Sequence, residues 1–241
     1  MEIYLSPFCL NFFTQTTNQI LHISSETTKG MDGETPKLKD QILETGASST
    51  QSFEPVNSIC AHLNAFHVYA SNPSRHVEAN HYCTHLSADL RQCLIYDTPK
   101  NPARLIGIEY MVPKAVYERL DVEERKLWHS HVYEVKSGML IMPNAIVPET
   151  VWDTAETAEM KELVGLYGKT YHFWQVDRGD ALPLGTPQLM MSFTADNQIP
   201  WETVRNRDER YGIKTEKKRD LRQRIESPEI LDDADSCWKG R

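Results

Sequence analysis

Short runs of β-branched and aromatic residues, rather than long apolar stretches, limit how this chain can fold. The longest apolar runs are 105–112 and 139–147. Each is about half of the roughly 20 residues that a helix needs to cross a bilayer. We therefore expect no transmembrane insertion. Runs of this length between turn residues are typical of strands in a globular core.

The strand-like runs are mixed with a few helical patterns, which indicates an α+β fold. We expect a single compact domain of mixed, mainly antiparallel strands with flanking helices and flexible ends. Helical spacing of apolar residues predicts helices over 54–66, after Asp121 and over 148–167. Strands are predicted at 66–70, 77–86, 90–96, 105–112, 139–142, 171–176 and 188–193.

The composition changes twice along the chain. Residues 1–52 are interpreted as a disordered N-terminal extension, because most of 31–53 is too polar to bury a core. The folded domain is expected over 53–200. Residues 201–241 are predicted to form a loosely attached, charged helical tail, because 205–224 carries nine basic and four acidic side chains.

The overall charge and the cysteines exclude several classes of protein. A net charge of -8 over 241 residues argues against nucleic acid as a main partner, since phosphate binding needs a basic field. The five cysteines are odd in number, irregularly spaced and contain no CxxC pair. We therefore expect neither a disulfide framework nor a zinc ribbon, and a reducing, cytoplasmic location.

Histidines are concentrated in one segment, with five of the nine lying in 62–85. If 77–86 is a strand, His81, Cys83 and His85 share one face. Imidazole and thiolate together suit zinc, iron or copper. The competing interpretation is a face of buried, hydrogen-bonded polar residues. Cys83 between two histidines is also a candidate activated thiol, and Glu78 is a nearby candidate acid or base.

A second cluster consists of His129, His131 and Glu134. The two histidines share a face only if this segment is extended. The pattern is partly similar to the first metal motif of cupins, but its glutamate lies too close and no clear second motif follows. The competing interpretation is a polar turn at a helix end.

Both clusters together would make a more complete site than either alone. We predict that His81, His85, His129 and His131 bind one divalent transition metal: zinc, iron, manganese or copper. Glu134, Glu78 and Cys83 are the candidate catalytic residues.

A third segment, 174–187, is rich in glycine and proline and is expected to be a shaped loop. Asp177, Arg178 and Asp180 within it have two interpretations. They can form an ion-pair network that fixes the loop, which we favour, or they can bind a ligand carboxyl or phosphate group through the arginine.

Six segments resemble the oil-body-associated proteins of plants, a family with relatives in fungi and bacteria. They are Phe66–Ala70, Glu78–His85, Arg91–Asp97, Ala103–Tyr110, Leu127–Gly138 and Asp177–Gly185. The resemblance implies a peripheral role on lipid droplets, as the plant members are associated with seed oil bodies and with their size and stability. It supplies no catalytic or metal-binding residues.

Three functions follow from these observations. The resemblance implies a peripheral lipid-droplet protein, for which the basic segment 205–224 is a candidate docking element. The histidines indicate a metal-dependent enzyme acting on a small apolar metabolite. The third is a metal-free protein that binds a lipophilic ligand. A homodimer is a candidate assembly for each of them.

Overall fold

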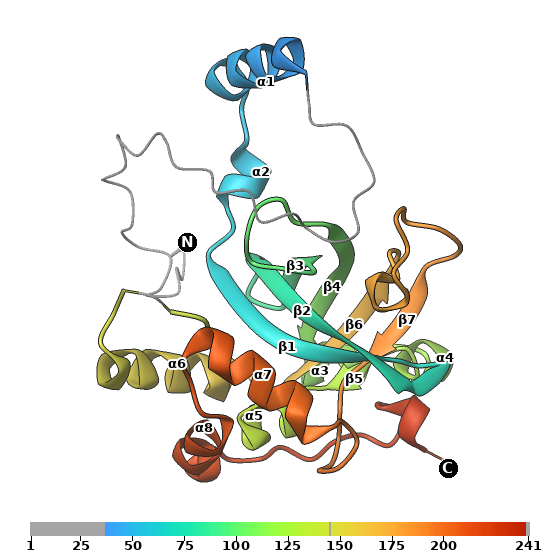
Figure 1. Cartoon of the computed structure of the whole chain (residues 1–241). Helices are drawn as coiled ribbons and strands as arrows, with labels where there is room; N and C mark the ends of the chain where they lie inside the picture. Colours follow the sequence, from blue (N-terminus) through green and yellow to red (C-terminus); the bar gives the residue numbers. More distant parts are fainter. Residues whose placement is uncertain (1–36, 145, 240–241) are drawn as a thin grey trace, which may run out of the picture. The chain divides into compact units, whose positions relative to one another are not determined.

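The computed structural model describes residues 37–144 and 146–239, and it divides the chain into two compact units, Met1–Cys60 and Ala61–Arg241 (Figure 1). In the first unit, α1 (Leu38–Thr50) and α2 (Glu54–Asn57) are helical. The expected disorder of 1–52 is therefore wrong for α1, while residues 1–36 lie outside the described part.

The second unit is built on an antiparallel sheet with the strand order β4-β3-β2-β1-β7-β6-β5. An additional pairing between β4 and β6 closes six of the strands into a ring. This arrangement confirms the α+β class with antiparallel strands. The strands are β1 (Ala61–Tyr69), β2 (Asn72–Ser87), β3 (Leu90–Tyr96), β4 (Leu105–Pro113), β5 (His129–Ser130), β6 (Leu166–His172) and β7 (Gln188–Met191).

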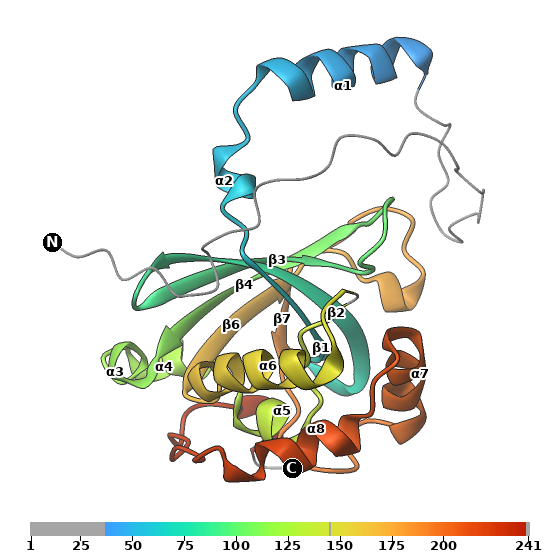
Figure 2. The same cartoon turned by 90° about the vertical axis from the view of Figure 1, so that its left-hand side faces the viewer.

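Figure 2 shows α5, α6 and α8 together below the strands of the second unit. Apolar side chains of α5 and α6 pack against inward-facing residues of the ring, and α7 packs against the outer face of β1. The helices are α3 (Lys114–Tyr117), α4 (Val122–Arg125), α5 (Val132–Ser137), α6 (Glu149–Leu163), α7 (Trp201–Tyr211) and α8 (Thr215–Leu221), with 3-10 turns η1 (Val176–Arg178), η2 (Arg222–Arg224) and η3 (Ser236–Trp238).

The predicted helix over 54–66 is wrong beyond Asn57. Residues Ala61–Tyr69 form β1 instead, which pairs with β2 along its length and with β7 at its end. Both faces of β1 are buried from Leu63 onwards, so its apolar residues do not alternate with polar ones. A strand buried on both faces can show apolar residues at helical spacing by chance, and tertiary pairing then decides its conformation.

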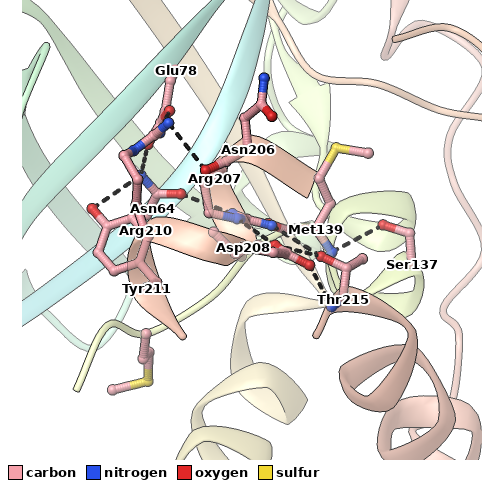
Figure 3. Close-up of polar contacts among 12 residues, drawn as sticks. Asn64, Glu78, Ser137, Met139, Asn206, Arg207, Asp208, Arg210, Tyr211 and Thr215 are labelled. Carbon is pink, nitrogen blue, oxygen red and sulfur yellow. Dashed lines mark hydrogen bonds and ion pairs between the residues drawn. The ribbon is translucent and has the colours of Figure 1, made fainter. Parts of the chain in front are cut away.

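The predicted charged tail at 201–241 belongs instead to the same compact unit as the sheet. Arg207 of α7 is fully buried, and Figure 3 shows its guanidinium at the centre of a polar network. The guanidinium donates hydrogen bonds to Asp208, Asn64, Thr215 and the carbonyl of Met139, at 2.8 to 3.1 Å. The hydrogen bonds of Arg207 therefore hold α7 against β1 and against the start of α8.

One disulfide, between Cys83 and Cys93, was not expected from the cysteine spacing. The two residues are directly opposite each other in the β2–β3 pair, with Cα atoms 4.0 Å apart. The irregular sequence spacing concealed this, because strand register rather than spacing brings them together. Cys83 is therefore not a free thiol, and its proposed role as an activated nucleophile is wrong for this state of the protein.

Candidate metal centre

The inside of the strand ring carries a cluster of buried histidines around one glutamate. Strand register points Glu109 of β4 and His81 of β2 into the ring, because alternate residues of a strand share a face. His67 of β1 and His172 of β6 point the same way. Two more histidines enter from β5 and its end, so the complete set is His67, His81, Glu109, His129, His131 and His172, all buried.

Glu109 is at the centre of this cluster. Its Oε2 lies 3.3 Å from Nε2 of His81, and its Oε1 lies 3.2 Å from Nε2 of His129 and 3.5 Å from Nε2 of His131. Nε2 of His81 is also 3.1 Å from Nε2 of His67. Strands β1 and β2 of the ring, β5 and the residue after β5 thus bring ring nitrogens close to the carboxylate of Glu109.

Gly168 of β6 provides the space for this convergence. A Cβ atom there would overlap Oε1 of Glu109 and would lie 2.7 Å from Nε2 of His129. Because real Cβ atoms do not approach other atoms this closely, any larger residue would displace the carboxylate or the imidazole. Glycine is required here for space and not for an unusual backbone angle.

The electrostatics of the cluster concentrate one negative charge at its centre. Burial alone would raise the pKa of Glu109, but the imidazoles of His129, His131 and His81 reverse this effect and hold it well below its ordinary value. Burial lowers the pKa of His131, and the Glu109 carboxylate more than offsets this and raises it to about 9. A proton on His131 or a bound cation can therefore balance the buried carboxylate.

The outer histidines stay neutral. Burial lowers the pKa of His67 well below its ordinary value, and any positive charge on the neighbouring rings of His81 or His172 would lower it further. Burial lowers the pKa of His172 to about 3. Neutral imidazoles have the free lone pair that a metal ion needs.

Several atoms of the cluster lack hydrogen-bond partners among the residues that the structure describes. They are Nδ1 of His81, Nδ1 of His129, Nδ1 of His172 and Oε1 of Glu134, whereas Oε1 of Glu109 and Nε2 of His129 meet each other in an ion-pair contact of 3.2 Å. Native proteins rarely bury polar atoms unpaired, and unpaired ring nitrogens and carboxyl oxygens are groups that a bound cation or a water molecule can satisfy.

The donor set fits a transition metal. Ligands of a tetrahedral zinc ion with bonds of about 2.1 Å are separated by about 3.4 Å, close to the distances around Glu109. Two groups, His67 with His81 and Glu109, and Glu109 with His129 and His131, each have ligand atoms within 4.8 Å of one another. Nδ1 of His131 lies 3.0 Å from the carbonyl of Leu166, a contact that orients Nε2 towards the centre.

The structure brings together three of the four histidines predicted as ligands. His81, His129 and His131 lie in the cluster, but His85 is exposed at the end of β2. Glu134 on α5 is buried and lines the same cavity as His81, Glu109 and His131. Burial raises the pKa of Glu134, and the nearby histidines only partly oppose this.

The other predicted catalytic residues lie elsewhere. Glu78 lies on the other face of β2, where it accepts a hydrogen bond from Asn64 at 2.9 Å and pairs with Arg210. Cys83 faces the inside of the ring but is held in the disulfide.

The residues predicted as ligand-binding form an ion-pair network at the base of the 174–187 loop. Asp177 accepts a hydrogen bond from Tyr69 at 2.6 Å and pairs with Arg75 at 2.7 Å, while Arg178 pairs with Asp180. These contacts correspond to the favoured interpretation, in which the charges fix the loop.

Sequence reasoning missed His67, Glu109 and His172. One pattern could have identified Glu109, because it is the only charged residue in the apolar strand 105–112. A charge in such a run is costly to bury unless it has partners. His67 and His172 have no comparable pattern, and only the closure of the ring brings them to Glu109.

The part of the chain that matches a known protein family includes every residue of the cluster. A family model described as "Protein of unknown function (DUF1264)" matches residues 53–226. "Oil body-associated protein 1B" of Arabidopsis thaliana is 45% identical over 210 residues, which cover 86% of this chain and 85% of that protein. "Oil body-associated protein 1A" of Zea mays is 46% identical over 188 residues, covering 78% and 76%. No solved structure matches the chain significantly.

Proposed function

Because the chain belongs to the oil body-associated protein family, we propose that it acts as a peripheral protein at the cytoplasmic surface of lipid droplets. The observation that carries this proposal is the similarity along most of the chain to relatives named for oil bodies. Within the described residues, no helix has the length and apolar character to cross a membrane. Contact with a droplet would then be made by surface side chains.

The basic segment 205–224 is a poor docking element. Arg207, Lys218 and Arg222 are buried, and each pairs with a carboxylate of the folded unit. Arg210 and Arg219 also pair with acidic side chains. Charges neutralised in this way do not make a free basic surface for anionic lipid.

An exposed apolar loop at 181–187 suits contact with a droplet better. Its seven residues include no charge, and Leu182 and Leu184 are 60% and 55% exposed. The base of the loop is fixed, since the indole of Trp174 donates a hydrogen bond to the carbonyl of Asp180 at 2.8 Å. A loop with a fixed base and an uncharged tip can insert leucines into a phospholipid monolayer with less loss of chain entropy than a free chain.

Flotation with triacylglycerol droplets coated with phosphatidylcholine tests this proposal. We expect the wild type to float. The double variant Leu182→Asp, Leu184→Asp should bind about tenfold or more weakly, because a charge replaces each leucine that would enter the monolayer. Leu86→Asp is the matched control, since Leu86 is 55% exposed on the β2–β3 hairpin. Equal flotation of all three proteins would exclude the loop, and a wild type that does not float would refute droplet contact.

A second function is favoured by the buried cluster. We propose that His81, Glu109, His129 and His131 hold one divalent transition metal: zinc, iron, manganese or copper. The supporting observation is that the Nε2 atoms of three histidines, from β2, from β5 and from the residue after β5, converge on the carboxylate of Glu109. His67 lies within reach as a further ligand, and His172 orients it through a contact of 3.0 Å between their ring nitrogens.

Elemental analysis of untagged protein tests the metal centre. We expect about one equivalent of metal per chain, lost in His81→Ala and retained in His85→Ala. The two histidines share β2, but only His81 reaches the cluster, so the pair separates a specific ligand from general histidine affinity. Circular dichroism would show that the His81 variant is folded. Metal loss in both variants, or no metal even after reconstitution, would refute the proposal.

The size of the cavity limits the ligand or substrate that the two remaining functions, ligand binding and metal-dependent catalysis, could use at this cluster. The cavity next to Glu109 has a volume of about 10 Å³, which is at the lower limit of the roughly 10 to 15 Å³ that a single water molecule needs. A lipophilic metabolite does not fit there. The metal-free ligand-binding function therefore has no support at this cluster, and a metal-dependent reaction there would need a much smaller substrate.

A further inference from the structure

Strand β5 carries His129 and is followed directly by His131, but the sheet alone holds it weakly. It is two residues long, lies at one end of the strand order and, among the described strands, pairs only with β6. A pairing this short is marginal by itself, because isolated strand pairs need further packing to be stable. Contacts from another part of the chain would therefore help to keep both imidazoles beside Glu109.

Asp235, close to the C-terminal end of the chain, makes such contacts. Ser130 donates two hydrogen bonds to its carboxylate, from the backbone N–H to Oδ1 and from Oγ to Oδ2, each 2.8 Å long. The backbone N–H of Asp235 donates to the carbonyl of Trp128 at 3.0 Å. The two backbone groups of this segment lie on either side of His129 in the chain. Asp235 thus takes the place that a neighbouring strand would have beside β5.

The short segment around Asp235, residues 233–238, is itself anchored on other parts of the fold. Before Asp235, Asp233 pairs with Arg125 at 2.8 Å. After it, the indole of Trp238 donates a hydrogen bond to the carbonyl of Ser192 at 2.8 Å. Asp235 is 5% exposed, so its bonds to Ser130 are shielded from competition by water. The carboxylate is therefore a fixed support for β5.

We propose that Asp235 is a positioning residue of the metal centre, which holds His129 and His131 towards Glu109 by binding Ser130 between them. This inference rests on the proposed metal centre. Asp235 supplies no ligand atom to either candidate metal-binding group. It acts through the backbone from which both imidazoles project, in the way that groups behind metal ligands orient them.

Cobalt(II) titration followed by visible absorption tests the inference, because the cobalt bands report the geometry of the ligands. Asp235 has a φ of 58°, which glycine adopts without strain, so Asp235→Gly removes the carboxylate and keeps the backbone. We expect this variant to bind cobalt at least about tenfold more weakly, with altered bands. Asp235→Asn tolerates the same φ and can still bond both groups of Ser130 through its amide. It should restore the wild-type spectrum and affinity.

Asp232→Gly is the matched control, because Asp232 is an exposed aspartate close by in the chain, and it should behave like the wild type. Ser130→Ala is a second variant. It removes only the hydroxyl bond to Asp235 and should also alter the cobalt bands.

A lower urea midpoint for Asp235→Gly, with the wild-type cobalt spectrum and affinity, would show a merely structural role. That result would overturn the positioning role and leave the metal centre standing. An unchanged spectrum in Ser130→Ala and in any folded Asp235→Gly protein would overturn it too, as would an equal loss of affinity in Asp232→Gly or Asp235→Asn. A wild type that binds no cobalt would overturn the metal centre itself, and this inference with it.

Discussion

Replacing Arg207 by alanine is expected to lower the free energy of unfolding by about 3 to 5 kcal/mol, the usual effect of removing one partner of a buried charge pair. The substitution leaves Asp208 without its counter-ion in the protein interior. It also removes hydrogen bonds to Asn64, Thr215 and the carbonyl of Met139 (Figure 3). Urea denaturation followed by circular dichroism measures the loss.

Two further variants define the cause of this loss. Arg205→Ala on the same helix is the control, because Arg205 is exposed and exposed substitutions usually change stability by at most about 0.5 kcal/mol. Arg207→Lys keeps the charge but loses the planar fork that reaches four partners, so we expect an intermediate effect. A loss below about 1 kcal/mol for Arg207→Ala would show that α7 is not fastened by this network.

Replacing Gly168 by alanine is expected to weaken metal binding by at least about 100-fold, the upper end of the effects seen when groups that orient metal ligands are changed. The added methyl group would occupy the space of Oε1 of Glu109 and crowd Nε2 of His129. The substitution changes no metal-binding atom itself. Its effect would come from the displacement of two proposed ligands, Glu109 and His129. Competition titration with a chromogenic chelator measures the change in affinity.

The control for this variant lies three residues earlier. A Cβ atom at Gly165 would meet nothing within 4 Å, so Gly165→Ala should bind metal like the wild type. Both variants should keep the circular dichroism spectrum of the folded protein. Unchanged affinity in Gly168→Ala would remove Glu109 and His129 from the list of ligands, whatever the elemental analysis shows.

The position of the proposed ligands links metal binding to folding. They come from β2, β4, β5 and the segment after β5, so no metal site exists until the strands have paired. Binding energy of this kind contributes directly to the stability of the folded state. The exposed loop at 181–187 belongs to the connection between β6 and β7 of the same ring.

The sequence by itself determined the elements with a strong local pattern. The apolar run at 90–96 predicted β3 with the observed bounds, and the helical stripe in 148–167 predicted α6. Helix α6 is shorter than predicted, because Tyr167 pairs in β6 rather than extending the stripe. The concentration of histidines likewise identified three members of the cluster, because closely spaced pairs of histidines are uncommon in a sequence.

The tertiary structure determined the features that depend on pairing between segments far apart in the sequence. Segment 61–69 became a strand because it pairs with β2 and β7 while packing buries both of its faces, and Cys83 met Cys93 through the register of two neighbouring strands. The ring closes only through the pairing of β4 with β6, and this closure brings Glu109 to the histidines. Local sequence patterns describe neighbours along the chain, whereas a buried site depends on which strands pair and in which register.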